Sequence, residues 1–147
     1  RYLVIIKTAC RELNFPAPPW VQFALDRLAP FVRGMRHGDG VIARFNGTSD
    51  LAPTDVDTIL AASDSRARPH ENAPDAGFQR LKKRRTTIIM DAGAPTSGDI
   101  SRAANAGTLS FEMSDGKDPV VINMGTANTV GEFAEMAKLG RPLIVHL

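Results

Sequence analysis

Several side chains in the first third of the chain are suited to contact a ligand. His37 and Asp39 flank Gly38 in a glycine-rich turn, where an imidazole and a carboxylate two positions apart could face the same ligand. The same turn also fits a purely structural role, in which Asp39 accepts a hydrogen bond from a nearby backbone N–H. Asn46, before Gly47, has the same two interpretations: contact with ligand hydroxyls, or a turn residue that tolerates positive φ.

The most conspicuous charge cluster is a run of four cations, Lys82, Lys83, Arg84 and Arg85. Such a run is compatible with nucleic-acid binding or nuclear import. It falls between two predicted strands, however, where a solvated basic hairpin is the default interpretation. The net charge of the chain is only +2, which gives no electrostatic case for nucleic acid. We therefore expect no nucleic-acid partner.

Composition excludes several other classes of protein. A single cysteine, Cys10, rules out an internal disulfide framework and the common cysteine-rich zinc sites. No apolar run approaches the roughly 18 residues of a membrane span, and no signal-peptide cleavage pattern follows the apolar residues 2–6. Hydrophobic residues make up 43% of the chain, as in soluble globular proteins. We expect a soluble protein with no membrane partner. The composition is compatible with the cytoplasm and with the periplasm.

The first half of the chain, which must position His37 and Asp39, has a helical pattern. Residues 1–13 and 20–35 predict helices, and Pro30 predicts a kink or break in the second one. A short strand is predicted for residues 41–45. A short helix follows at residues 54–63, with Thr54 and Asp57 in capping-box position, and then a surface loop at 63–76.

The second half of the chain has a β pattern. Strands are predicted at residues 78–81, 86–90, 108–113 and 119–123, with a hairpin loop at 114–117 and a final helix at 129–139. Alternation with polar neighbours places Phe78, Leu109 and Phe111 in the sheet core. Helices followed by an antiparallel sheet predict an α+β fold, or two joined partial domains.

Five short segments carry a family resemblance. They are Arg-His-Gly-Asp-Gly at 36–40, Ala-Arg-Phe-Asn-Gly at 43–47, Asp-Ala-Gly-Phe-Gln-Arg-Leu at 75–81, Asp-Ala-Gly-Ala-Pro at 91–95 and Ala-Gly-Thr-Leu-Ser-Phe-Glu-Met-Ser at 106–114. In this order they resemble the heparinase II/III-like family of polysaccharide lyases, in its bacterial, alphaproteobacterial form. In that family an α/α toroid precedes an antiparallel β-sandwich, and the substrate lies between them. The resemblance implies a toroid end at residues 1–36, a connecting segment with a short strand and helix at 37–75, and a partial sandwich at 76–147.

The resemblance also implies a reaction, β-elimination on acidic polysaccharides. A base removes the proton beside the uronate carboxylate, an acid protonates the leaving oxygen, and a cation or amide neutralises the carboxylate. Family members use Tyr and His for the proton transfers. The only tyrosine here is Tyr2, far from any matching segment, and the family's His-x-His-x-Asp pattern is replaced by residues 103–107, which contain no histidine. We therefore expect no catalytic residue in this chain.

A zinc site of some family members is also not expected. Asn123 stands where those members have an aspartate ligand, and an amide is a poor zinc ligand, so we predict no metal and no cofactor. The family's later histidine is not matched by His146, whose flanking residues differ. A frameshift near Leu139 or plain divergence would explain that difference.

These observations lead to two hypotheses. The first is a truncated or fragmentary relative of a polysaccharide lyase, inactive alone. The alternative is a non-catalytic β module that binds acidic glycans or self-associates as a homo-oligomer through open sheet edges. The residues expected to bind acidic polysaccharide are His37, Asp39, Asn46, Arg80, Lys82, Lys83, Arg84, Arg85 and Asn105.

Overall fold

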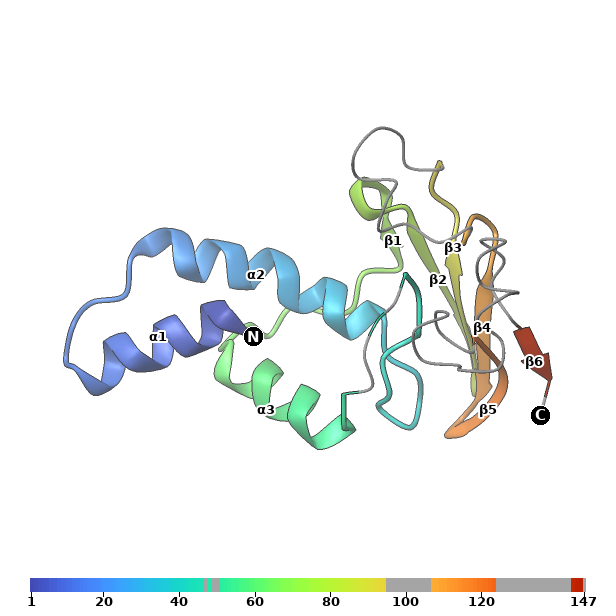
Figure 1. Cartoon of the computed structure of the whole chain (residues 1–147), viewed down its shortest axis with the longest axis horizontal. Coiled ribbons are helices and arrows are strands. Elements are labelled where there is room, and N and C mark those ends of the chain that lie inside the picture. The colour runs from blue at the N-terminus through green and yellow to red at the C-terminus, as the bar shows by residue number, and fades with distance from the viewer. Residues whose placement is uncertain (47, 49–50, 95–106, 124–143, 147) are drawn as a thin grey trace, which may run out of the picture.

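Helices gather at one end of the molecule and an antiparallel sheet at the other (Figure 1). The computed structural model describes residues 1–46, 48, 51–94, 107–123 and 144–146. Its helices are α1 (Tyr2–Glu12), α2 (Pro19–Gly34) and α3 (Pro53–Ala62). Its strands are β1 (Asn72–Ala73), β2 (Phe78–Lys83), β3 (Thr86–Asp91), β4 (Phe111–Asp115), β5 (Asp118–Asn123) and β6 (Ile144–His146). The predicted α+β class is confirmed.

Helix α2 extends from the outer end of the helical region towards the sheet (Figure 1). It begins at Pro19, a favourable first position because that N–H would have no helical partner. The helix continues through Pro30 to Gly34, so of the predicted kink or break the break is wrong, and the kink stays a prediction. No helix in the described residues has the length and apolar character needed to cross a membrane.

A stripe of small and branched side chains on α2 holds the other two helices. Val21, Leu25 and Ala29 recur at four-residue steps, which places them on one helical face, and all three are buried. Val4 of α1 packs on the first two, and Val56 of α3 packs on Ala29. The three helices therefore share a small core along α2.

Helix α3 begins differently from the sequence-based expectation. Its first residue is Pro53, and no side chain caps its N-terminus, so the predicted capping box of Thr54 and Asp57 is wrong. Asp57 instead accepts a hydrogen bond from Arg36, whose Nη1 lies 2.7 Å from Asp57 Oδ1. This ion pair links α3 to the residue that follows the C-terminal turn of α2.

The segment after α2 does not form the strand predicted for residues 41–45. Only an isolated bridge joins Arg36 and Ile42. The Ala43 N–H donates to the Met35 carbonyl at 2.8 Å, and the Arg44 N–H donates to a carboxylate oxygen of Glu112 at 3.0 Å. These two N–H groups thus bond to the Met35 carbonyl and to a side chain, and not to the backbone of a neighbouring strand. For this reason no strand ladder forms here.

The sheet is a meander in which every strand pairs antiparallel with the next along the chain. The strands predicted at 78–81, 86–90 and 119–123 are confirmed, with small extensions. The strand predicted at 108–113 begins only at Phe111, because Leu109 adopts a left-handed turn conformation with φ 66°. The hairpin predicted at 114–117 is confirmed by the pairing of Asp115 with Asp118. The helix predicted at 129–139 lies outside the described residues.

The two faces of β3 and β4 carry opposite kinds of side chain. The face towards the helices carries Thr87, Ile89, Glu112 and Ser114, all buried. The other face carries half-buried apolar side chains, namely Ile88, Met90, Phe111 and Met113. Three of the four side chains turned towards the helices are thus polar, and these polar groups need partners.

Aromatic and aliphatic side chains complete the junction between helices and sheet. Ile89 is fully buried in a cluster with Met35 and Phe45, and the ring centroids of Phe45 and Phe78 lie 5.1 Å apart. The core position predicted for Phe78 is confirmed. The core position predicted for Leu109 is wrong, because its side chain is 68% exposed.

Candidate functional site

A buried polar cluster of His37, Glu112 and Ser114 joins the turn after α2 to strand β4. His37 Nε2 lies 3.1 Å from Glu112 Oε2, and His37 Nδ1 lies 2.9 Å from Ser114 Oγ. The side chains of His37 and Glu112 are 8% and 3% exposed. An ionised carboxylate can only accept, so the Nε2–H of His37 donates to Glu112. With a neutral ring, the Ser114 hydroxyl then donates to Nδ1.

The second carboxylate oxygen of Glu112 is also occupied. Glu112 Oε1 accepts the backbone N–H of Arg44 and that of Asn123, both at 3.0 Å. One buried carboxylate therefore joins three segments: the turn after α2, strand β4 that carries it, and strand β5. His37 uses both ring nitrogens inside this cluster. Its predicted contact with substrate stays a prediction.

The structure gives Asp39 and Asn46 the geometry of turn residues. Asp39 Oδ1 accepts the Val41 N–H at 2.9 Å, as expected for an Asx turn. Asn46 has φ 49°, in the left-handed region, and its side chain is exposed. Their predicted contacts with a glycan remain predictions, and Asn105 lies outside the described residues.

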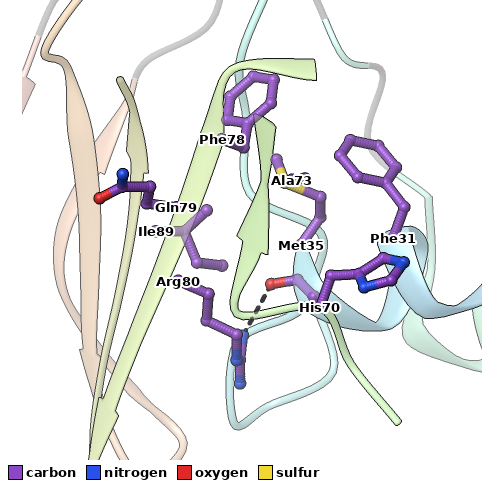
Figure 2. A pocket seen from close by; sticks show the side chains of 9 residues that line it. Phe31, Met35, His70, Ala73, Phe78, Gln79, Arg80 and Ile89 are labelled. Carbon is purple, nitrogen blue, oxygen red and sulfur yellow. Dashed lines mark hydrogen bonds between the residues drawn. The ribbon is translucent and has the colours of Figure 1, made fainter. Parts of the chain in front are cut away.

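Arg80 is held at the C-terminal end of α2. Its Nη1 donates to the carbonyls of Gly34 at 2.9 Å and Arg36 at 2.6 Å, and Figure 2 shows the first of these bonds. Carbonyls at a helix end have no partner within the helix, and a cation there also interacts favourably with the helix dipole. Burial lowers the pKa of Arg80 below its ordinary value, and the Glu71 carboxylate opposes that shift. Arg80 is thus turned towards α2, and its predicted contact with a glycan stays a prediction.

The small cavity shown in Figure 2 lies beside Arg80, at the junction of α2 and the sheet. Phe31, Met35, Phe78 and Ile89 are among the side chains around it. Its volume is about 10 Å³, which corresponds to a single water molecule. The cavity is therefore too small to hold a sugar.

The remaining predicted cations are exposed at the end of the β2–β3 hairpin. Lys82, Lys83, Arg84 and Arg85 all face solvent, and Lys117 is exposed in the neighbouring β4–β5 hairpin. We call these five residues the basic tip.

Two hairpin ends meet at the basic tip. The Gly116 N–H donates to the Arg85 carbonyl at 2.9 Å, and Thr86 of β3 pairs with Asp115 of β4. Arg85 also forms ion pairs with Asp115 at 3.3 Å and with Asp118 at 3.8 Å. The other four cations form no ion pair with a described residue. The tip therefore has an excess of positive charge that is open to a ligand.

The turn that carries His37 and Asp39 lies against this same end of the sheet. A Cβ added at Gly38 would lie 1.8 Å from the carbonyl oxygen of Gly116, so the two backbones are in close contact. Gly116 in turn hydrogen-bonds Arg85. The structure thus brings together two groups of predicted binding residues that are more than 40 positions apart in the chain.

Tyr2 and His37 have the side-chain types that the family uses for proton transfer, and they lie in different environments. Tyr2, the only tyrosine, is 81% exposed in the first turn of α1, whereas His37 is enclosed by Glu112 and Ser114. No group of three metal-ligating side chains occurs within residues 1–46, 48, 51–94, 107–123 and 144–146. The predicted absence of a metal and of catalytic residues stays a prediction.

Sequence reasoning missed Glu112, Ser114 and Asn123 as partners in this cluster. Alternation along β4 assigned Phe111 to the core, which makes Glu112 and Ser114 face solvent. In the structure, Glu112 and Ser114 are buried on the side of the sheet that faces the helices, and Phe111 is only half-buried. The signal available in the sequence was a polar residue at two alternate positions of β4, Glu112 and Ser114. Alternation alone does not reveal which face is buried.

Taken together, the helical segment and the antiparallel meander joined by a buried carboxylate define an α+β protein with a sheet-borne candidate site. The family model for the C-terminal domain of heparinase II/III-like proteins matches residues 65–146, a range that contains all six described strands. The chain belongs to the heparinase II/III-like family. No curated protein and no solved structure matches it.

Proposed function

We propose that this chain is part of a polysaccharide lyase that acts on acidic polysaccharides. Within it, the chain contributes binding through the basic tip and does not perform β-elimination by itself. The family match supports the first statement. The observation that carries the binding role is the exposed basic tip, where four of five cations have no ion-pair partner in the described chain.

The chemistry of the basic tip fits an anionic polymer. Hydrogen bonds from ammonium or guanidinium groups to carboxylate or sulfate oxygens are stronger than neutral ones. The groups at the tip are solvent-exposed, so salt will weaken their attraction for a polyanion. Their positions on two adjacent hairpin ends spread the charge over a surface rather than a pocket, as suits a long chain with repeated charges.

The requirements of β-elimination support the proposed lack of catalysis. A base and an acid must reach the proton beside the carboxylate and the leaving oxygen. In the described residues, the tyrosine is exposed on α1 and the buried histidine already uses both ring nitrogens. An active site would need groups that these residues do not bring together.

Retention on immobilised heparin and alginate under a rising salt gradient tests the proposal. A double variant, Lys82→Ala with Lys83→Ala, should elute at lower salt than the unchanged protein. The matched control is Arg11→Ala with Arg66→Ala, which removes two exposed cations away from the tip and changes net charge equally. Equal elution of the two double variants would refute a binding role for the tip.

The second readout is the ultraviolet absorbance of an unsaturated uronate product. Incubation of the chain with heparin, alginate and pectate should give no increase in this absorbance. A steady increase, dependent on protein concentration, would show that the chain is catalytically competent and would overturn that part of the proposal.

A further inference from the structure

Helix α2 has apolar side chains on two opposite faces. The first face, with Val21, Leu25 and Ala29, packs against α1 and α3, which both lie on one side of α2 (Figure 1). The apolar residues of the second face recur at three- and four-residue steps and are Trp20, Phe23, Ala24, Leu28 and Phe31. We call these five residues the outer stripe. Helices that are apolar on both sides normally pack against partners on both sides.

The large side chains of the outer stripe are open to solvent. Trp20 is 58% exposed and Phe23 is 74% exposed, and Leu28 is exposed as well. Single exposed apolar residues are ordinary on a protein surface, but these three follow one another along one helical face. A contiguous apolar stripe of this kind is typical of a surface that binds another protein.

One end of the outer stripe opens into a groove. The groove lies between α2 and residues 67–76, and Leu28 and Phe31 line it on the side of the helix. Its volume is about 720 Å³, in the range that holds drug-sized ligands, so an indole ring fits inside it. The His70 N–H donates to the Pro30 carbonyl at 3.1 Å, which attaches the far wall to the helix without any ligand.

Trp20, at the other end of the outer stripe, matches this groove in a two-fold pair. Trp20 and Phe31 lie about 16 Å apart along the helix axis, at the rise of an α-helix. When a second copy lies antiparallel on the stripe, with the two-fold axis between residues 25 and 26, Trp20 of each copy comes opposite Phe31 of the other. Phe23 then comes opposite Leu28, and the symmetry forms each of these contacts twice. Large apolar side chains thus meet large apolar side chains along the stripe.

The charges beside the outer stripe also complement those of a second copy. Asp26 and Arg27 are both exposed near the midpoint of the stripe. An antiparallel helix pair brings the same edge of each helix together, so Asp26 of each copy comes near Arg27 of the other. The small Ala24 lies opposite Arg27 and leaves room for its long side chain. Opposite charges that meet across an interface favour the correct partner and register.

We propose that the outer stripe is a dimer interface, in which two copies of this chain pair through α2 in antiparallel orientation and each inserts Trp20 into the groove of the other. The partner is a second copy because the protruding indole, the groove and both charges occur on one surface of a single chain, as a two-fold interface requires. This interface belongs to the helical segment. It is separate from the basic tip and from the sheet edges, where self-association stays a prediction.

Trp20 is the only tryptophan in the chain, so its fluorescence reports on the proposed contact directly. Sedimentation equilibrium of the whole chain should give the mass of one chain at low concentration and twice that mass at high concentration. The emission maximum of Trp20 should move to shorter wavelength over the same concentrations, because the indole leaves water. A mass that stays that of one chain would overturn the proposal, and so would a dimer in which the Trp20 emission does not change.

Trp20→Glu should raise the dissociation constant of the dimer roughly thirtyfold or more, the effect of losing a tryptophan at the centre of binding. The fold should tolerate this change, since Trp20 is exposed and a carboxylate is favourable in the first turn of a helix. The matched control is Leu81→Glu, which makes the same charge change at a similarly exposed apolar residue of β2 and should leave the dimer intact. Circular dichroism and urea midpoints show that both variants fold. A dimer that survives Trp20→Glu, or that Leu81→Glu abolishes, contradicts pairing through the outer stripe.

Discussion

His37 Nε2 and Glu112 Oε2 lie 3.1 Å apart, although 75 positions separate these two residues in the chain. The same carboxylate accepts the backbone N–H groups of Arg44 and Asn123. The side chain of Glu112 thus bonds to the segment after α2 and to β5 at the same time. Glu112 therefore helps to hold the turn after α2 on the sheet, together with the hydrogen bonds of Ser114 and Arg80.

The first prediction concerns the loss of this carboxylate. Glu112→Ala should lower the free energy of unfolding by about 3–5 kcal/mol, because it leaves two backbone N–H groups and the histidine without their buried partner. Glu112→Gln keeps an acceptor oxygen, so it should cost less, about 1–2 kcal/mol. Urea denaturation of both variants measures the difference, and equal costs would show that the charge rather than the acceptor matters.

A second prediction concerns the close approach of Gly38 to Gly116. Gly38→Ala places a Cβ 1.8 Å from the Gly116 carbonyl oxygen, so the backbones must separate. We expect the free energy of unfolding to fall by about 2–4 kcal/mol. The neighbouring change Asp39→Ala removes only the hydrogen bond to Val41 and should cost about 1 kcal/mol. Thermal or urea unfolding in which both variants lose the same stability would contradict the close packing.

The third prediction addresses Arg80 as a partner of the helix end. Arg80→Met keeps the aliphatic stem but removes both hydrogen bonds to the Gly34 and Arg36 carbonyls. It should cost about 1–3 kcal/mol, and Arg80→Lys should recover part of this because it restores a cation near the helix C-terminus. Denaturant midpoints of the two variants provide the comparison. A Lys variant no better than Met would mean that only the guanidinium geometry can satisfy these carbonyls.

A fourth prediction follows from the left-handed backbone at Arg84, which has φ 54° in the β2–β3 turn. Glycine adopts this conformation without the steric cost of a Cβ, so Arg84→Gly should stabilise the protein by about 0.5–1 kcal/mol. It should also lower the salt needed to elute the protein from heparin, since one tip cation is lost. A variant that is less stable than the unchanged protein would contradict the strain argument.

The last prediction is a pH effect at Lys7 and Asp64. Lys7 Nζ donates to Asp64 Oδ2 at 2.6 Å, and this hydrogen bond and charge lower the pKa of Asp64 from its ordinary value of 3.8. A depressed carboxyl pKa stabilises the folded state above the unfolded pKa, and the contribution is lost as pH falls through the folded pKa. In Lys7→Met the Asp64 pKa should therefore rise towards 3.8, as measured by NMR titration of the carboxyl carbon.

The stability comparison of the same variant gives an independent check. The difference in unfolding free energy between the unchanged protein and Lys7→Met should be largest near neutral pH. It should shrink as the pH falls below the depressed pKa of Asp64, because the protonated carboxyl no longer pairs with Lys7. High salt should also reduce the difference, since Asp64 is 66% exposed.

The sequence predicted the elements that local patterns specify. Helical periodicity placed α2, and the Asp-Gly pair at 115–116 placed the β4–β5 hairpin. The strand predicted at 41–45 failed because its N–H groups bond to Met35 and to the Glu112 side chain, partners that no local pattern encodes. Leu109 failed because the turn before β4 requires a left-handed residue there.

The candidate site was predicted only in part, for the same reason. The cations at 82–85 were identified from the charge run alone, and their exposed position on a hairpin agrees with the structure. Arg80 belongs to the same stretch and shares a face of β2 with Lys82, yet its Nη1 donates to the Gly34 carbonyl at the end of α2, whereas Lys82 is exposed. Glu112 was not recognised because its role depends on residues 37 and 44, which come next to it only in the folded chain.

The meander order of the sheet has a consequence for how the chain reaches this structure. The β2–β3 and β4–β5 hairpins close short loops, at residues 84–85 and 116–117, which carry a low entropic cost. Joining His37 to Glu112 closes a far longer loop. We therefore expect these two hairpins to form before the helical segment docks. Glu112 variants should then accelerate unfolding and leave the refolding rate almost unchanged, which stopped-flow kinetics can measure.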